Sequence, residues 1–188
     1  MCKGIVIEGH LIPDISKSIV LESGDLYQLI TWIVSNCGIA WNEYIDQHWQ
    51  LKLGHRDEVF KQWFAQHIHQ HHVHKVAPKP LSRTIMQNIY RNYGLPPDSF
   101  NKHYLECANG TDRPRYILAD EMDLHDPRGK RLTPSRQELI RKNETGELSK
   151  YLKRQANITV RSQANSYIYL CSHPVCPSKG TQHCFCLQ

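Results

Sequence analysis

Short apolar runs alternate along the chain with segments in which apolar residues recur at helical spacing. The runs occupy residues 4–7, 37–41 and 116–119, and Ile158-Thr159-Val160 is a plausible last strand. Uninterrupted apolar runs of this length are typical of strands that are covered on both faces, as in parallel sheets. Alternation of such strands with helices predicts an α/β fold, with a central, mainly parallel sheet flanked by helices.

The segments between the runs predict the helices. Cap residues, prolines and glycines set their expected ends, and apolar residues three and four positions apart set their buried faces. We expect helices from Ser23 through Ile33, from Asn42 through Trp49, from Asp57 to about His74, from Ser82 to Tyr93, from Leu95 through Ala108, and from Ser135 to Gln155 with an interruption at Gly146.

The length of 188 residues suits one domain with a short appendage. We predict a domain over residues 1–165 and a Cys/His-rich tail over residues 166–188. The longest apolar runs are too short to cross a bilayer, so no membrane partner is expected. Because Met1-Cys2-Lys3 leads directly into a strand-like run, the start does not resemble a signal peptide and a cytoplasmic location is predicted.

Carboxylates follow the apolar runs at the positions where ligands of parallel sheets gather. Glu8 follows the first run, and Asp120, Glu121 and Asp123 follow the third. If these two strands are neighbours, Glu8 lies near Asp120 and Asp123, and two distant segments share one acidic site. Glu43 stands at another strand-to-helix junction, although a Glu in the first turn of a helix is also favoured by the helix dipole. Asp123 has the alternative of capping a turn.

The order of these acids resembles that of the PIN-domain nucleases, over roughly residues 4 to 126. The resemblance rests on Ile5-Val6-Ile7-Glu8, on Ala40-Trp41-Asn42-Glu43-Tyr44, on Asn101 with Ala108 seven residues later, and on Leu118-Ala119-Asp120-Glu121-Met122-Asp123. It implies a PIN-like metal-dependent nuclease with Glu8, Glu43, Asn101, Asp120 and Asp123 as catalytic residues. Of these, Glu8, Glu43, Asp120 and Asp123 would bind Mg²⁺ or Mn²⁺, which suit oxygen ligands better than Zn²⁺ does.

Two positions depart from the family pattern. Glu8 stands where the family has an Asp, and Asn101 stands where it has an acid. An amide keeps an oxygen ligand but removes a charge, although Asp98, three residues earlier, offers a replacement. The chain is therefore either an active endoribonuclease or an inactive PIN-like module that binds RNA or a partner protein. A phosphatase is a weaker alternative, because no Asp-x-Asp pair or glycine-rich phosphate loop is present.

Basic residues concentrate between Arg128 and Arg161, within a chain of net charge +5. Such a run is either a solvated helix face or a surface that contacts phosphates. With the acidic site, it favours RNA as the substrate, with single-stranded DNA as the second choice. The resemblance also implies a role as a toxin held by an antitoxin, in defence or in RNA processing, and leaves homo-oligomers open.

Histidines and cysteines offer two further candidate metal sites. On one helix, His67, His71 and His74 would share a face, but nothing nearby completes a known metal motif, and a solvated polar face is the simpler interpretation. The chain has seven cysteines, and the tail ligands Cys171, Cys176, Cys184 and Cys186 suit a structural Zn²⁺. Free thiols and a disulfide remain alternatives for the tail.

Overall fold

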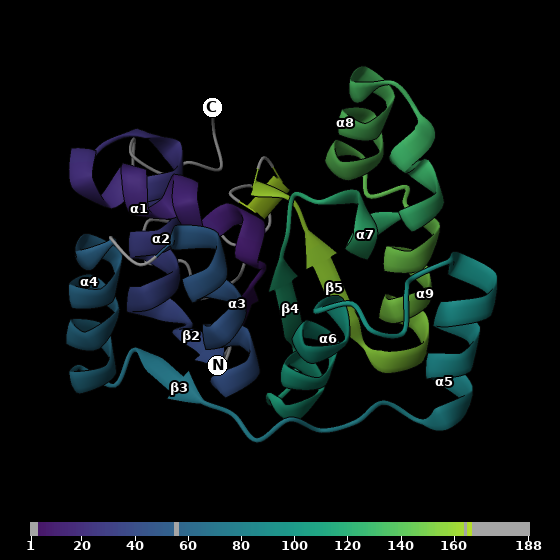
Figure 1. The fold of residues 1–188 in the computed structure, drawn as a ribbon, viewed down its shortest axis with the longest axis horizontal. Coiled ribbons are helices and arrows are strands. Elements are labelled where there is room, and N and C mark those ends of the chain that lie inside the picture. Colours follow the sequence, from purple (N-terminus) through teal and green to yellow (C-terminus); the bar gives the residue numbers. More distant parts are fainter. Residues whose placement is uncertain (1–3, 55–56, 164, 167–188) are drawn as a thin grey trace, which may run out of the picture.

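A five-stranded, fully parallel sheet forms the centre of the protein (Figure 1). The computed structural model describes residues 4–54, 57–163 and 165–166. The strand order is β3-β2-β1-β4-β5. The strands are β1 (Ile5–Ile7), β2 (Ile39–Trp41), β3 (Val73–Lys75), β4 (Arg115–Leu118) and β5 (Ile158–Arg161). The predicted α/β architecture is confirmed.

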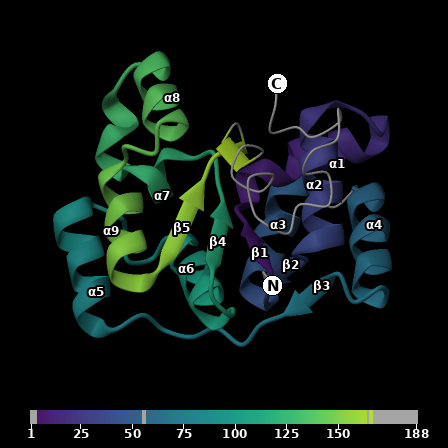
Figure 2. The same ribbon diagram turned by 180° about the vertical axis from the view of Figure 1, so that it is seen from behind.

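Helices flank this sheet, as seen from the two sides in Figures 1 and 2. Helix α6 contacts β1, β2, β4 and β5, while α9 packs along β5 and α4 contacts β3. The α-helices are α1 (Ile12–Leu21), α2 (Gly24–Asn36), α3 (Glu43–Leu53), α4 (Glu58–His69), α5 (Arg83–Asn88), α6 (Asn101–Gly110), α7 (Met122–His125), α8 (Pro134–Lys142) and α9 (Glu147–Ala156). Short 3-10 segments η1 (Gly9–Leu11) and η3 (Pro127–Arg131) and a π-helical turn η2 (Ile89–Tyr93) complete the described elements.

The apolar runs become strands because both of their faces are covered. All three residues of β1 are buried, and β1 pairs with β2 on one side and with β4 on the other. Burial of continuous apolar runs is the pattern expected of a central parallel strand. The predicted neighbourhood of the first and third runs is therefore confirmed, and it brings the residues that follow them together.

The prediction of one helix from Asp57 to about His74 is wrong at its end. Helix α4 ends at His69, and His71 adopts a left-handed φ of 60° that turns the chain. The next residues form β3, whose Val73 is buried and whose backbone pairs with β2. As a strand, this segment makes backbone hydrogen bonds with β2. These bonds replace the helical hydrogen bonds that the segment would otherwise make. His67, His71 and His74 consequently do not share a helix face.

A second correction concerns the start of the helix before β4. We expected Leu95-Pro96-Pro97-Asp98 to open it, but these residues form a turn, and α6 begins at Asn101. Asp98 is exposed in this turn, so it does not lie one helical turn before Asn101 as a replacement ligand. Helix α1, which follows Glu8 closely and carries Pro13 in its first turn, was not predicted at all.

Other local predictions hold. Ser23 precedes α2, and the Asn42 side chain caps α3 by accepting a hydrogen bond from the Ile45 backbone N–H at 3.1 Å. Gly146 separates α8 from α9, as its position in the sequence suggested. None of the described helices combines the length and the apolar character that a bilayer-spanning segment needs.

The cysteine predictions divide between described and undescribed residues. Cys37 and Cys107 are both buried, and Cys107 is a free thiol, as expected of a reduced cysteine. The candidate zinc ligands Cys171, Cys176, Cys184 and Cys186 lie outside the described residues. The zinc site and the boundary between domain and tail stay predictions.

Candidate metal centre

The strand order defines a crevice between the carboxyl ends of β1 and β4. From β1 the chain runs to β2 and β3 on one side, and it later returns to β4 and β5 on the other side of β1. Ligands of open parallel sheets gather at such a reversal of strand order. The Glu8 backbone N–H donates to the Leu118 carbonyl at 2.9 Å, so the segments after both strands start side by side.

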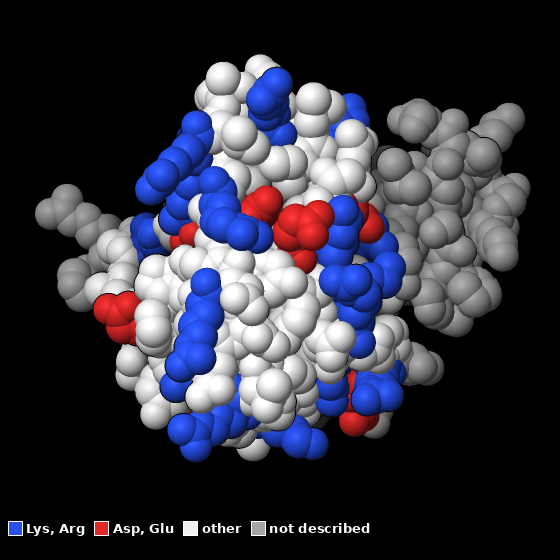
Figure 3. Space-filling model, turned by 90° about the vertical axis from the view of Figure 1, so that its right-hand side faces the viewer, with Lys and Arg blue, Asp and Glu red and all other residues white. Residues whose placement is uncertain are grey.

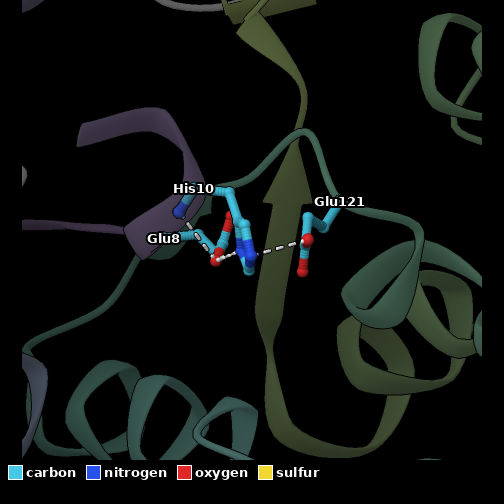
Figure 4. A group of neighbouring side chains, drawn as sticks. All are labelled: Glu8, His10 and Glu121. Atoms are coloured by element: carbon cyan, nitrogen blue, oxygen red, sulfur yellow. Dashed lines mark hydrogen bonds and ion pairs between the residues drawn. The ribbon is translucent and has the colours of Figure 1, made fainter. Parts of the chain in front are cut away.

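Three side chains converge at this crevice (Figure 4). The Nδ1 of His10 lies 2.7 Å from Oε1 of Glu8, and its Nε2 lies 2.9 Å from Oε1 of Glu121. One potential ligand atom from each residue lies within 4.8 Å of the others. In the part of the chain that the structure describes, this is the group of three or more His, Cys, Asp or Glu side chains that has the spacing of a metal site.

Local backbone structure places Glu8 and His10 together. Glu8 is the N-cap of η1, and its Oε1 accepts a hydrogen bond of 3.0 Å from the His10 backbone N–H. A side chain added at Gly9 would meet the Tyr104 hydroxyl at 2.7 Å and Nδ1 of His48 at 2.8 Å. The absence of a side chain at residue 9 thus lets this turn pack directly against Tyr104 and His48. The turn points the imidazole of His10 back over the carboxylate of Glu8.

Burial makes the Glu8 carboxyl electrostatically unusual. The Glu8 residue is fully buried, and desolvation raises its pKa to about 7, with the charges of Asp120 and Asp123 contributing in the same direction. Its Oε2 atom is buried and has no hydrogen-bond partner among the described residues. An unsatisfied buried carboxylate oxygen is costly, because it has lost water without gaining a donor or a cation. A cation bound at this group could supply the partner that Oε2 of Glu8 lacks.

The other two members of the group are also perturbed. Burial and the nearby Glu8 charge raise the pKa of Glu121, while burial lowers the pKa of His10. Lys52 contacts Nε2 of His10 and adds positive charge beside the imidazole. A neutral imidazole keeps one nitrogen lone pair, and this lone pair would have to turn from its present partners to a metal to act as a ligand.

Two of the predicted acids border this group. Asp123 forms an ion pair of 2.6 Å with Lys130, and Oδ1 of Asp120 accepts a hydrogen bond of 2.8 Å from the Gln163 backbone N–H. The charges of both acids act on the Glu8 pKa. The structure thus brings Glu8, Asp120 and Asp123 into one acidic neighbourhood. Glu121 belongs to it as well, because His10 contacts the carboxylates of both Glu8 and Glu121.

The structure does not bring Glu43 into the group. Its side chain is exposed at the start of α3 and forms an ion pair with Lys75 on β3. This pair, with the Glu43 backbone N–H, lowers the pKa of the Glu43 carboxyl. Glu43 thus occupies the predicted strand-to-helix junction, but its charge is already balanced by a lysine.

Asn101 is placed differently, as a buried residue at the first position of α6. Residues three apart share a face of a helix, so Asn101 lies on the face that carries Tyr104. The Tyr104 hydroxyl accepts a hydrogen bond from the Gly9 backbone N–H, next to Glu8 and His10. The predicted residue therefore shares a helix face with Tyr104, which contacts the turn that carries the site.

An aromatic layer supports the site and extends to the surface. The Tyr104 hydroxyl and Nδ1 of His48 are 2.5 Å apart, and burial lowers the pKa of His48 to about 4. The His48 ring lies 5.8 Å from that of His10, centroid to centroid, and stacks on Phe100 at 4.3 Å. Phe100 remains 37% exposed. A continuous aromatic path thus runs from the carboxylates to an exposed ring.

The donor set fits a divalent cation. One potential ligand atom from each of the three residues lies within 4.8 Å of the other two, which is close enough for a single ion to contact all three. Carboxylate oxygens suit Mg²⁺ and Mn²⁺, and imidazole nitrogen suits the softer transition metals. Two carboxylates with one imidazole could therefore hold a metal ion.

Sequence reasoning missed His10 and left Glu121 out of the ligand set. The available signal was an acid and a histidine two residues apart, Glu8 and His10, directly after a buried strand and separated by glycine. Such a turn returns the second side chain over the first.

Comparison of the chain with protein-family models, curated proteins and solved structures finds no match.

Proposed function

We propose that this protein is a metal-dependent nuclease that hydrolyses phosphodiester bonds in RNA. Glu8, His10 and Glu121 hold the divalent cation, with Mn²⁺ as the best fit. Asp120 and Asp123 stand beside them and keep the crevice negative. The proposal follows the resemblance to PIN-domain nucleases in fold and in the acids after β1 and β4, and it replaces Glu43 by Glu121 as a ligand.

The observation that carries the proposal is the bonding of Glu8. A fully buried carboxyl group with one oxygen, Oε1, bonded to His10 and the other, Oε2, without a partner is costly for the folded chain. Buried charges in proteins are paired or coordinate metals. A cation that binds all three residues would remove this cost.

The chemistry of phosphodiester hydrolysis suits such a centre. A bound divalent cation lowers the pKa of a water molecule and offsets the charge that develops on the phosphoryl oxygens. The Gly9 turn holds Glu8 and His10 at fixed separation, and the Lys130 and Gln163 contacts hold Asp123 and Asp120 in place. The chain thus provides a preorganised acidic crevice, in which no side-chain nucleophile is needed.

Nucleic acid is favoured as the substrate by what surrounds the crevice. Lys52 contacts His10, and Lys130 pairs with Asp123, so basic side chains border the acidic group. On one face of the molecule, Lys and Arg side chains lie beside acidic ones (Figure 3). Such borders attract phosphates flanking the bond to be cut. The exposed ring of Phe100, connected to the site through His48, offers a surface on which an unpaired base stacks. Unpaired bases favour single-stranded RNA.

The test is cleavage of a labelled single-stranded RNA in the presence of Mn²⁺. We expect cleavage that EDTA abolishes and that Glu121→Gln reduces by about 10–100-fold, because the amide keeps the shape of the side chain but loses the ligand charge. Glu58→Gln is the matched control, since Glu58 pairs with Lys61 on the exposed side of α4. Activity that survives both EDTA and Glu121→Gln contradicts the proposal, and cleavage of a DNA strand alone would change the substrate.

An inactive RNA-binding module is the second candidate, because Asn101 supplies no charge on the face of α6 that meets the site. Restoring the acid with Asn101→Asp distinguishes the two. For a nuclease scaffold we expect Mn²⁺-dependent cleavage to rise by at least about tenfold, which corresponds to about 1.4 kcal/mol of barrier. The conservative control is Asn101→Gln. Intact RNA binding without any cleavage in either variant would favour the module.

A further inference from the structure

A second concave site lies at the amino end of β4, whereas the acidic crevice lies at the carboxyl end of the same strand. Its volume is about 610 Å³, and it is formed by the loop before α5, the end of α6, the start of β4 and the end of α9. Arg115 opens β4, whereas Asp120 follows its end. At about 3.3 Å per strand residue, the two sites are roughly 16 Å apart along β4.

The lining of this hollow is strongly cationic. Five of its side chains are basic and none is a carboxylate: Lys79, Arg113, Arg115, Lys153 and Arg154. Cations gathered in a concave surface reinforce one another's potential, because the field is focused between low-dielectric walls. An anion placed there would be attracted by all five.

Part of this charge has an internal role. Arg115 donates from Nε to the Thr111 carbonyl at 3.3 Å and from NH1 to the Ala156 carbonyl at 3.0 Å. These bonds satisfy carbonyls at the ends of α6 and α9, a known role of basic residues near helix C-termini. Of the five N–H groups of a guanidinium, three remain for other partners. Arg115 is thus a fixed donor rather than a mobile surface chain.

The other four cations have no such explanation. Lys79, Arg113, Lys153 and Arg154 are exposed, and none of them forms an ion pair with a carboxylate in residues 4–54, 57–163 or 165–166. Arg113 stands two residues before Arg115, and its charge, after burial, contributes to lowering the pKa of Arg115. Like charges held close together without a counter-ion destabilise the free protein and favour a bound anion.

We propose that this basic hollow binds phosphate groups of a single-stranded nucleic acid. Arg115 supplies directed hydrogen bonds, and the four exposed cations supply electrostatic attraction to neighbouring phosphates. The hollow is open to solvent, which suits a chain that enters and leaves it. Its polar neighbours Ser82 and Asn157 add hydroxyl and amide donors at the rim. The inference stands independently of the acidic crevice, since no residue is shared between the two sites.

The test is the binding of a fluorescein-labelled, 12-nucleotide single-stranded RNA, measured by anisotropy in EDTA so that no metal-dependent cleavage occurs. The variant carries Arg113→Glu and Lys153→Glu, both at exposed positions. The control carries Lys17→Glu and Lys61→Glu on α1 and α4, with the same change in net charge. Circular dichroism melts confirm that both proteins are folded. If the hollow variant is not folded, it is replaced by the milder variant Arg113→Gln with Lys153→Gln.

For the hollow variant we expect the affinity for RNA to fall at least about tenfold. We also expect the slope of log K against log salt concentration to become shallower by about 1.4, because each of the two lost phosphate contacts contributes about 0.7. The control is expected to change both quantities much less. Equal losses in the two proteins would overturn the proposal. A second titration uses ATP: saturable binding that is lost in the hollow variant, with RNA binding unchanged, would retain phosphate as the ligand chemistry and assign its source to a free nucleotide. Because all measurements are made in EDTA, they do not depend on whether the protein cuts RNA.

Discussion

In EDTA, Glu8→Gln is expected to be more stable than the wild-type protein above pH 7 by up to roughly 3 kcal/mol, and to lose this advantage as the pH falls toward 4.5. The cause is the pKa of Glu8, which burial raises from 4.5 to about 7 in the folded chain. Between these values the folded state keeps a proton that the unfolded state has released. Stability therefore falls as the pH rises through this interval, by about 1.4 kcal/mol for each unit of pKa difference.

The measurement is urea unfolding of both proteins at several pH values between 4.5 and 8. Groups distant from the site titrate alike in both proteins, so the difference between the two curves reports Glu8 together with Glu121, whose pKa the Glu8 charge raises. Glu58→Gln, at an exposed ion pair, controls for the loss of a carboxylate. A constant difference across this pH range would contradict the account of Glu8.

The same substitution separates the metal site from simple burial. Mn²⁺ is expected to stabilise the wild-type protein at pH 8, where Glu8 is ionised, because a ligand that binds only the folded state raises its stability. Glu8→Gln is expected to lose this gain and to lower RNA cleavage by at least about 100-fold, since it removes the most buried ligand. Equal stabilisation of both proteins by Mn²⁺ would remove Glu8 from the metal site.

Trp49→Ala is expected to lower the free energy of unfolding by about 3–5 kcal/mol. Trp49 is 1% exposed, and its ring packs edge-on against Phe60 and Phe64 at centroid distances of 6.0 and 5.4 Å. Its indole N–H also donates to the Ile7 carbonyl at 3.1 Å. Truncation therefore leaves a large cavity and an unpaired carbonyl beside Glu8.

Trp49→Phe separates these two losses. It keeps most of the packing but removes the indole donor, for which we expect a cost of about 1–3 kcal/mol. We also expect weaker Mn²⁺ binding, because the Ile7 carbonyl and Glu8 belong to adjacent residues. Chemical unfolding and Mn²⁺ titration measure the two effects. Trp63→Ala, at a half-buried position on α4, is the control. A cost for Trp49→Ala no larger than that of the control would contradict the role of Trp49 in the core.

The sheet was predictable where burial on both faces leaves a continuous apolar run. β1, β2 and β4 carry such a run, whereas β5 alternates buried Ile158 and Val160 with the partly buried Thr159 and Arg161. Asn42 and Gly146 mark helix boundaries through their local chemistry. β3 carries no such signal, because only Val73 is buried and the strand exists through pairing with β2. Its formation is a tertiary effect that sequence periodicity does not record.

The candidate site was predictable to the level of strand ends but not of side-chain directions. Glu8 and the acids after β4 follow from the rule that parallel strands present their carboxyl ends together. Glu43 satisfies the same rule, yet its side chain pairs with Lys75, a residue of the unpredicted strand. His10 joins the site through a turn whose shape depends on Gly9 fitting beside Tyr104 and His48. These contacts are set by packing between distant segments.

The pairing of β1 with β4 also has a consequence for how the site comes into being. Glu8 and Glu121 are separated by most of the domain, and they meet only after the chain has closed a loop of that length. Such distant contacts form slowly, because chain entropy is lost before they bring any gain. A nascent or cleaved chain lacking the segment after β4 has only part of the ligand group. Tight binding of the cation would then report that the two halves of the protein have met.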